Sequence, residues 1–151
     1  MKSVGLTHGG FYGHFESRDA LLAEALERAL LEGEAKAGAN ESGASFHGIV
    51  RSYLSRAHRD TRDSGCAVAA LVSDVARADL ASRNVMTDHV EAFVETVAKT
   101  LSGDDERAIM AVSAMVGALT LSRVVTDPAR SNAILKVVRD HLDRLEAGEA
   151  S

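Results

Sequence analysis

A single proline, Pro128, stands in 151 residues, and from residue 17 onward apolar side chains recur at spacings of three and four. That spacing puts them on one face of an α-helix, and a chain with so little proline can sustain long helices. Ala, Leu, Val, Glu and Arg are abundant, which favours the same structure. Because no run of alternating apolar and polar residues occurs, the sequence predicts an all-α fold.

Composition excludes several classes of protein. A chain of this length buries enough surface to fold without a disulfide or metal staple. Its 46% hydrophobic and 26% charged residues exclude wholesale disorder. The one cysteine, Cys66, excludes an internal disulfide, so a cytoplasmic location is expected. With a net charge of −5, the chain as a whole is not typical of a nucleic-acid binder.

The longest apolar stretch, 108–121, is interrupted by Ser113 and Thr120. A membrane-spanning helix needs about 20 apolar residues. We therefore expect a buried or interface helix there and no association with a membrane.

The helical pattern divides into six segments. Ser17 is expected to cap a helix that starts at Arg18 and ends where a loop begins, in residues 33–43. The others are 45–62, 66–78, 82–101, 105–125 and 128–145. Segment 66–78 is apolar on all sides, so it should be central.

Two of these helices have an expected buried side. The side expected in 45–62 comprises Phe46, Ile49, Val50, Tyr53, Leu54 and Ala57. The side expected in 105–125 comprises Ile109, Val112, Val116, Leu119 and Val124. Ala111, Ala114 and Ala118 form a strip of small residues that permits close helix approach.

Residues 5–15 differ from the rest of the chain. Four glycines there, Gly5, Gly9, Gly10 and Gly13, would weaken a helix unless it had to lie close to another surface. Leu6, Phe11 and Phe15 can face one way, while the hydrogen-bonding side chains Thr7, His8, Tyr12 and His14 face elsewhere. A helix that reads the major groove of DNA needs this division.

The run from Gly5 to Leu22 resembles the end of the helix-turn-helix in TetR-family transcriptional regulators. Gly5-Leu6-Thr7 matches the turn that opens the recognition helix of that family. Tyr12 and Phe15 match its closing Tyr-x-x-Phe, and Ser17-Arg18-Asp19-Ala20-Leu21 matches the start of the next long helix. The resemblance implies an all-helical homodimer, with a ligand-binding domain that follows the DNA-reading element.

The resemblance also implies roles for single residues. Thr7, His8, Gly9 and Gly10 would form the front of the recognition helix, with Thr7 and His8 at base edges. Tyr12, His14 and Arg18 would contact phosphates. Residues 1–16 would be the remnant of the helix-turn-helix domain, and 17–151 the helical ligand-binding and dimerisation domain.

One departure from the family concerns the N-terminal side. The family has two further helices before this segment, whereas only Met1 to Val4 precede it here. Lys2, Arg18, Glu16 and Asp19 sum to zero charge over residues 1–20, although DNA affinity depends on cations that neutralise phosphates. We therefore expect an N-terminally truncated chain, with operator DNA bound by the intact protein and not by this chain alone.

The same reasoning predicts a ligand site and a dimer interface. A small apolar ligand would enter among the helices of 45–62, 66–78, 82–101 and 105–125, and the protein would be a ligand-responsive repressor. The candidate pocket residues are Tyr53, His58, Met86, His89, Phe93 and Met115. The homodimer would form through helices 105–125 and 128–145. The apolar side chains of these two helices would fit an intramolecular core equally well.

Other functions have less support in the sequence. The glycines lack the G-x-G-x-x-G spacing of a phosphate loop, and no two histidines have metal-ligand spacing. No nucleophile elbow or cofactor motif occurs, so no enzyme, metal or cofactor is expected. Cys66 is interpreted as a small buried residue, with a reactive thiol as the alternative. The alternative function is a helical dimer that binds a ligand or a protein partner without a DNA role.

Overall fold

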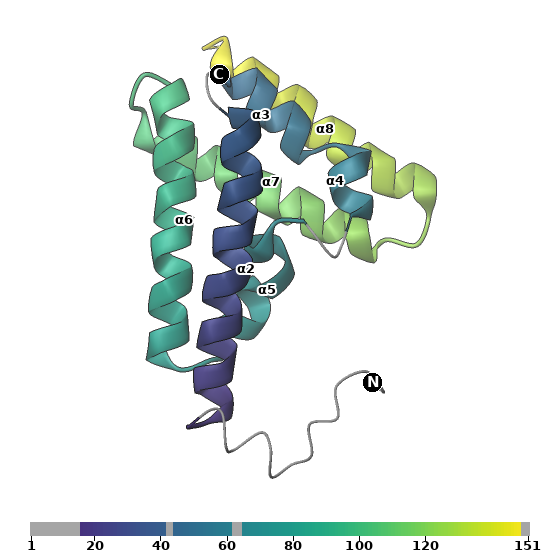
Figure 1. Ribbon diagram of the computed structural model, residues 1–151. Helices are drawn as coiled ribbons and strands as arrows, with labels where there is room; N and C mark the ends of the chain where they lie inside the picture. The colour runs from purple at the N-terminus through teal and green to yellow at the C-terminus, as the bar shows by residue number, and fades with distance from the viewer. Residues whose placement is uncertain (1–15, 42–43, 62–64, 149–151) are drawn as a thin grey trace.

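The computed structural model describes residues 16–41, 44–61 and 65–148, with 34–41 described by backbone alone. Every regular element in these ranges is a helix, which confirms the predicted all-α class (Figure 1). The helices are α2 (Arg18–Glu41), α3 (Phe46–Tyr53), α4 (Arg56–Asp60), α5 (Ala67–Val75), α6 (Leu80–Thr100), α7 (Asp105–Val124) and α8 (Pro128–Glu146).

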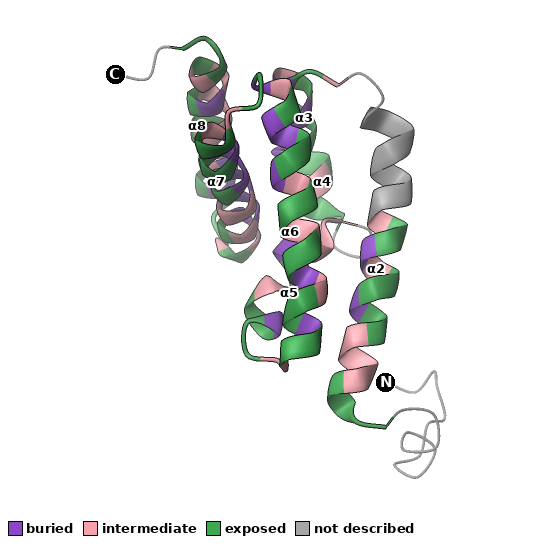
Figure 2. Ribbon diagram, turned by 90° about the vertical axis from the view of Figure 1, so that its left-hand side faces the viewer, coloured by how far each residue is buried: buried purple, intermediate pink, exposed green. Residues whose placement is uncertain are grey.

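Two hydrophobic clusters hold the helices together, and α6 contributes to both (Figure 2). The larger cluster joins α3, α7 and α8 to the C-terminal half of α6, with Phe46, Val97 and Met115 fully buried. The smaller joins α2 and α5 to the N-terminal half of α6 through Leu26, Leu30 and Met86. Helix α6 packs beside α2, and α7 packs against both α6 and α8.

Side-chain caps fix the starts of the long helices. The Ser17 hydroxyl accepts a hydrogen bond from the Ala20 N–H (3.1 Å), as predicted for the start of α2. Asp79, Asp104 and Asp127 accept from the first-turn N–H groups of α6, α7 and α8. Pro128 occupies the first turn of α8, where its missing N–H costs no helical hydrogen bond.

The loop predicted at 33–43 is wrong, because α2 continues to Glu41. Gly38 and Asn40 suggested a break, but Glu34, Ala35, Lys36 and Ala37 precede them. A helical glycine costs about 1 kcal/mol relative to alanine. Strong helix formers on its N-terminal side can offset that cost.

The single helix predicted at 45–62 is also wrong, because α3 ends at Tyr53 and α4 starts at Arg56. The Ser55 hydroxyl accepts a hydrogen bond from the His58 N–H (3.0 Å) and so starts a new helix. The change of direction buries Leu54 completely. It also leaves Ala57, which was expected on the buried side, exposed.

The buried side predicted for 105–125 is wrong in part. Ile109 and Val124 are 49% and 74% exposed, while Ala108, Ala111 and Ala118 are buried. Val112 and Leu119 are buried as predicted, and the small side chains of Ala111 and Ala118 let α7 approach its neighbours closely, so the core side of α7 combines alanines with larger residues. Helix α5, expected to be central, covers the smaller cluster from one side and exposes Ser73 and Asp74.

Helix α7 has the length and composition that a membrane span requires. Core helices of soluble proteins meet the same criterion, and one face of α7 packs within the larger cluster. This helix therefore gives only weak support to a location in a membrane.

Candidate functional site

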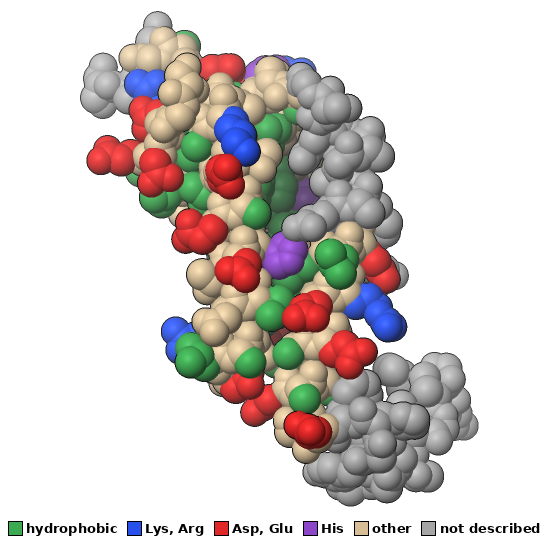
Figure 3. Space-filling model, turned by 60° about the vertical axis from the view of Figure 1, so that its left-hand side comes forward, with side chains coloured by type: hydrophobic (Ala, Val, Ile, Leu, Met, Phe, Trp, Pro, Cys, Tyr) green, Lys and Arg blue, Asp and Glu red, His purple; other side chains and the backbone are tan. Residues whose placement is uncertain are grey.

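A cavity of about 580 Å³ lies between α2, α3, α4, α5 and α6. Its wall is mainly apolar, with polar groups from Tyr53, His58, His89 and Thr96. In Figure 3, hydrophobic side chains lie in the furrow between α2 and α6, and Asp and Glu side chains stand out around it. A concave apolar space with a few polar groups is typical of a small-molecule site.

Tyr53, at the end of α3, is the polar centre of this wall. Its ring lies 4.7 Å from the ring of His58, edge to face, and 5.4 Å from the ring of Phe93. Its hydroxyl is shielded from solvent and has no hydrogen-bond partner of normal geometry in the described part of the chain. Burial, with the nearby Cys66 thiol, raises the pKa of Tyr53, so the phenol stays neutral and can still donate or accept.

His58 is held as a neutral imidazole of defined tautomer. The backbone N–H of Cys66 donates to Nε2 (3.1 Å), so the ring proton is on Nδ1, which donates to the Tyr53 carbonyl oxygen (2.7 Å). Burial lowers the pKa of His58, and the positive charge of Arg123 acts in the same direction. Since both ring nitrogens are occupied, His58 offers a ligand the surface of its ring.

Arg123 joins this wall to α7. Its Nη2 donates to the His58 carbonyl oxygen (3.0 Å) and its Nε to the Arg59 carbonyl oxygen (3.1 Å). The Arg59 side chain in turn donates to the Ser131 hydroxyl (2.9 Å) at the start of α8. Helix α4 is therefore fixed to both α7 and α8 by hydrogen bonds.

The structure brings together four of the six predicted pocket residues: Tyr53, His58, His89 and Phe93. Met86 lies in the smaller cluster and Met115 in the larger, and neither lines the cavity. Both side chains face neighbouring helices, which fill the space around them.

The predicted DNA-reading residues fall almost entirely beyond the part that the structure describes. Thr7, His8, Gly9, Gly10, Tyr12 and His14 lie outside the described residues. Arg18 is the first residue of α2 and is exposed.

Sequence reasoning missed several lining residues. Ala92 and Thr96 share a helical face with His89 and Phe93, so their spacing could have indicated them. Thr61, Gly65 and Cys66 lie between α4 and α5, where no periodic pattern indicates a side chain's direction. Cys66, interpreted as a small buried residue, is half-buried at the cavity wall.

The described residues contain no group of three His, Cys, Asp or Glu side chains arranged to hold a metal ion. No protein-family model matches the sequence, and no curated protein matches it either.

Proposed function

We propose that this chain binds a small, mostly apolar molecule in the cavity between α2 and α6, as the ligand-binding and dimerisation part of a TetR-like transcriptional regulator. The observation that carries the ligand-binding proposal is the buried Tyr53 hydroxyl in a mainly apolar wall, where it lies near the Cys66 thiol but has no hydrogen-bond partner of normal geometry among the described residues. Leaving a buried hydroxyl unsatisfied costs about 1–3 kcal/mol. A ligand that supplies a partner removes that cost.

The wall favours a particular kind of ligand. The rings of Tyr53, His58 and Phe93 suit a flat, apolar body. Because the Tyr53 hydroxyl is shielded from solvent, a hydrogen-bonding group on that body would reach it once the side chains around it moved aside. The cavity of about 580 Å³ falls within the usual range for small-molecule sites.

The dimer part of the proposal is supported by the outer surface of α7 and α8. Large apolar side chains are exposed there: Ile109, Met110, Leu121, Val124 and Val137. Pairing this surface with a second copy would bury them in a four-helix interface with two-fold symmetry. The Arg123 hydrogen bonds connect the cavity wall to α7, so a ligand could favour one dimer geometry over another.

A neutral apolar fluorophore, N-phenyl-1-naphthylamine, tests the cavity. We expect saturable binding to the wild-type chain and loss of binding in Ala92→Trp, which fills the cavity from α6. Ala81→Trp is the matched control, since Ala81 is exposed on the same helix and does not line the cavity. Equal binding by both variants, or none by the wild type, would contradict the proposal.

The regulator part needs a separate test. A longer protein would be expressed from the genomic reading frame, including the codons upstream of Met1. It would be used to select the duplex DNA sequences that it binds from a random pool. We expect a salt-dependent, sequence-specific mobility shift that an apolar ligand reverses. If the extended chain binds no DNA while the fluorophore still binds, the regulator role fails and ligand binding without a DNA role stands.

A further inference from the structure

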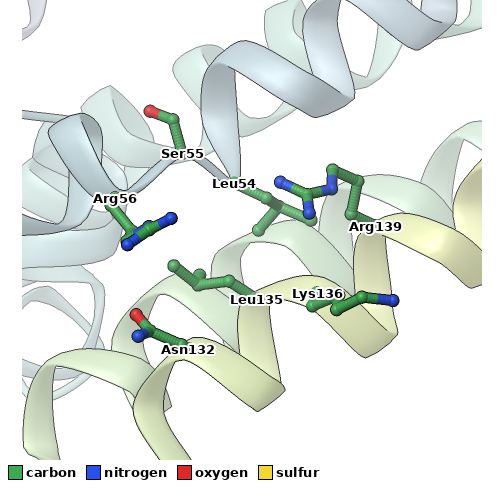
Figure 4. A pocket seen from close by; sticks show the side chains of 7 residues that line it. All are labelled: Leu54, Ser55, Arg56, Asn132, Leu135, Lys136 and Arg139. Carbon is green, nitrogen blue, oxygen red and sulfur yellow. The ribbon is translucent and has the colours of Figure 1, made fainter. Parts of the chain in front are cut away.

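A second hollow, of about 290 Å³, lies between the α3–α4 turn and α8 (Figure 4), and it shares only Ser55 with the apolar cavity. Two buried leucines, Leu54 and Leu135, belong to its wall. The remaining lining residues all carry hydrogen-bond donors: Ser55, Arg56, Asn132, Lys136 and Arg139. Three cations therefore line one small hollow of a chain whose net charge is −5.

The two guanidinium groups are available to a ligand. Within the described residues, neither Arg56 nor Arg139 makes a direct ion pair or a side-chain hydrogen bond. Arg59 nearby is different, because Asp60, Ser131 and Asn132 accept its hydrogen bonds. Two like charges beside one hollow repel each other, and an anion between them would remove that repulsion.

The side chains approach the hollow from opposite sides. In Figure 4 Arg139 extends from α8 over Leu54, and Arg56 stands across from it on α4. Lys136 runs along α8 away from Arg56, and it pairs with Asp140 (2.5 Å). The two arginines therefore form the core of the site, with Lys136 at its edge.

The neutral polar groups also present donors. Asn132 Oδ1 accepts from Arg59 Nη1 (2.8 Å), which leaves the Asn132 amide N–H groups for another partner. The Ser55 oxygen accepts from the His58 N–H, so its own O–H remains able to donate. The Arg56 and Arg139 guanidinium groups and the Asn132 amide lie around the leucines, whereas the Ser55 hydroxyl points away from them (Figure 4).

From this arrangement we propose that the hollow binds the phosphate group of a small ligand. A guanidinium donates two parallel hydrogen bonds to phosphate oxygens, and two such groups suit a dianion with several acceptor atoms. The small volume fits a compact anion. The apolar leucine side chains beneath lower the local dielectric constant and strengthen the attraction.

Isothermal titration calorimetry with inorganic pyrophosphate tests the site. We expect saturable binding to the wild-type chain, weakened about tenfold or more by Arg56→Gln or Arg139→Gln, because each removes charged hydrogen bonds. Arg139→Lys should weaken it less, since it keeps the charge and loses the paired geometry. Arg130→Gln is the matched control, with the same charge change at an exposed α8 position outside the hollow.

Thermal unfolding of each variant establishes that the altered proteins are folded. No binding by the wild type, or equal weakening by Arg130→Gln and Arg139→Gln, would overturn the proposal. Tighter binding of succinate would assign the site to carboxylates, and tighter binding of duplex DNA to a nucleic-acid backbone. Either result would overturn the phosphate assignment.

Ala92→Trp should bind pyrophosphate as the wild type does, because its substitution lies in the other cavity. The fluorophore therefore tests the proposed apolar site, and pyrophosphate tests the proposed phosphate site. Either proposal can fail without the other.

Discussion

Gly65 lies where the chain passes between Arg123 and Thr61. A Cβ added there would lie 2.7 Å from Arg123 Nη2 and 2.8 Å from the Thr61 carbonyl oxygen. The backbone oxygen cannot move without displacing the end of α4. Only glycine, which has no side chain, lets the backbone at position 65 come this close to Arg123 and Thr61.

Gly65→Ala should lower the free energy of unfolding by about 1–3 kcal/mol, the usual cost of overpacking. Urea denaturation measures the change. Gly33→Ala is the matched control: its Cβ would have no neighbour within 4 Å, and it lies inside α2. That substitution should stabilise the protein by up to about 1 kcal/mol. The same destabilisation in both variants would refute the steric explanation.

His58 should make stability depend on pH. Its pKa is lowered in the folded protein, so the unfolded chain binds a proton more readily. The stabilisation is complete above the unfolded pKa of about 6.5. It is lost as pH falls from there toward the lower folded pKa.

Urea denaturation of the wild type and His58→Gln at a series of pH values measures this dependence. The wild type should lose stability below about pH 6.5 more steeply than the variant, which has no proton to bind at this position. Parallel curves for the two proteins would show that His58 is not the titrating group.

Single residues of the cavity could be predicted where they followed a helical pattern. Tyr53 lies on the predicted buried side of 45–62, and His89 and Phe93, four residues apart, share one face of a helix; all three line the cavity. Met86 and Met115 were predicted to line the cavity as well, but they fill the two hydrophobic clusters. Periodicity shows which face is buried, but not whether a helix or an open space lies opposite. Arg56 and Arg139 are far apart in sequence, and only the fold brings them to one hollow.

Caps determine where the helices begin, and Asp104 is the clearest example. Its carboxylate accepts from the Arg107 N–H (3.0 Å), while Asp105 beside it lies in the first turn without serving as the cap. Asp104→Ala should cost about 1 kcal/mol in urea denaturation. Asp105→Ala should cost less, because it removes only the interaction with the helix dipole. A larger loss for Asp105→Ala would contradict this assignment.

The existence of the long helices could be predicted, and several of their boundaries could not. Helix α8 begins and ends close to the predicted 128–145, because Asp127 and Pro128 mark its start. The break between α3 and α4 was missed, although Ser55 is a residue type that caps helices. In α7 the apolar residues occur on all sides, so the pattern alone does not show that the side with Ala111, Val112 and Met115 packs within the larger cluster.

At the scale of the whole molecule, most of the large apolar side chains that are exposed among the described residues lie on α7 and α8. In the proposed dimer, Val137→Glu would place a charge in the interface from each copy. Sedimentation equilibrium should show a wild-type dimer and a dimer at least about tenfold weaker in this variant, since an unpaired buried charge is costly. Leu80→Glu, at an exposed position at the start of α6, should leave the dimer intact. A monomeric wild type would contradict the dimer.

The contact between Arg123 and α4 has a further consequence for how this protein tolerates change. Arg123 holds main-chain carbonyl oxygens of His58 and Arg59, which every amino acid possesses. Replacement of His58, whose side chain lines the cavity, can therefore alter what the cavity recognises while the main-chain hydrogen bonds to Arg123 persist. If the proposed ligand site is correct, its preference can change at position 58 without loss of the hydrogen bonds that hold α4 on α7.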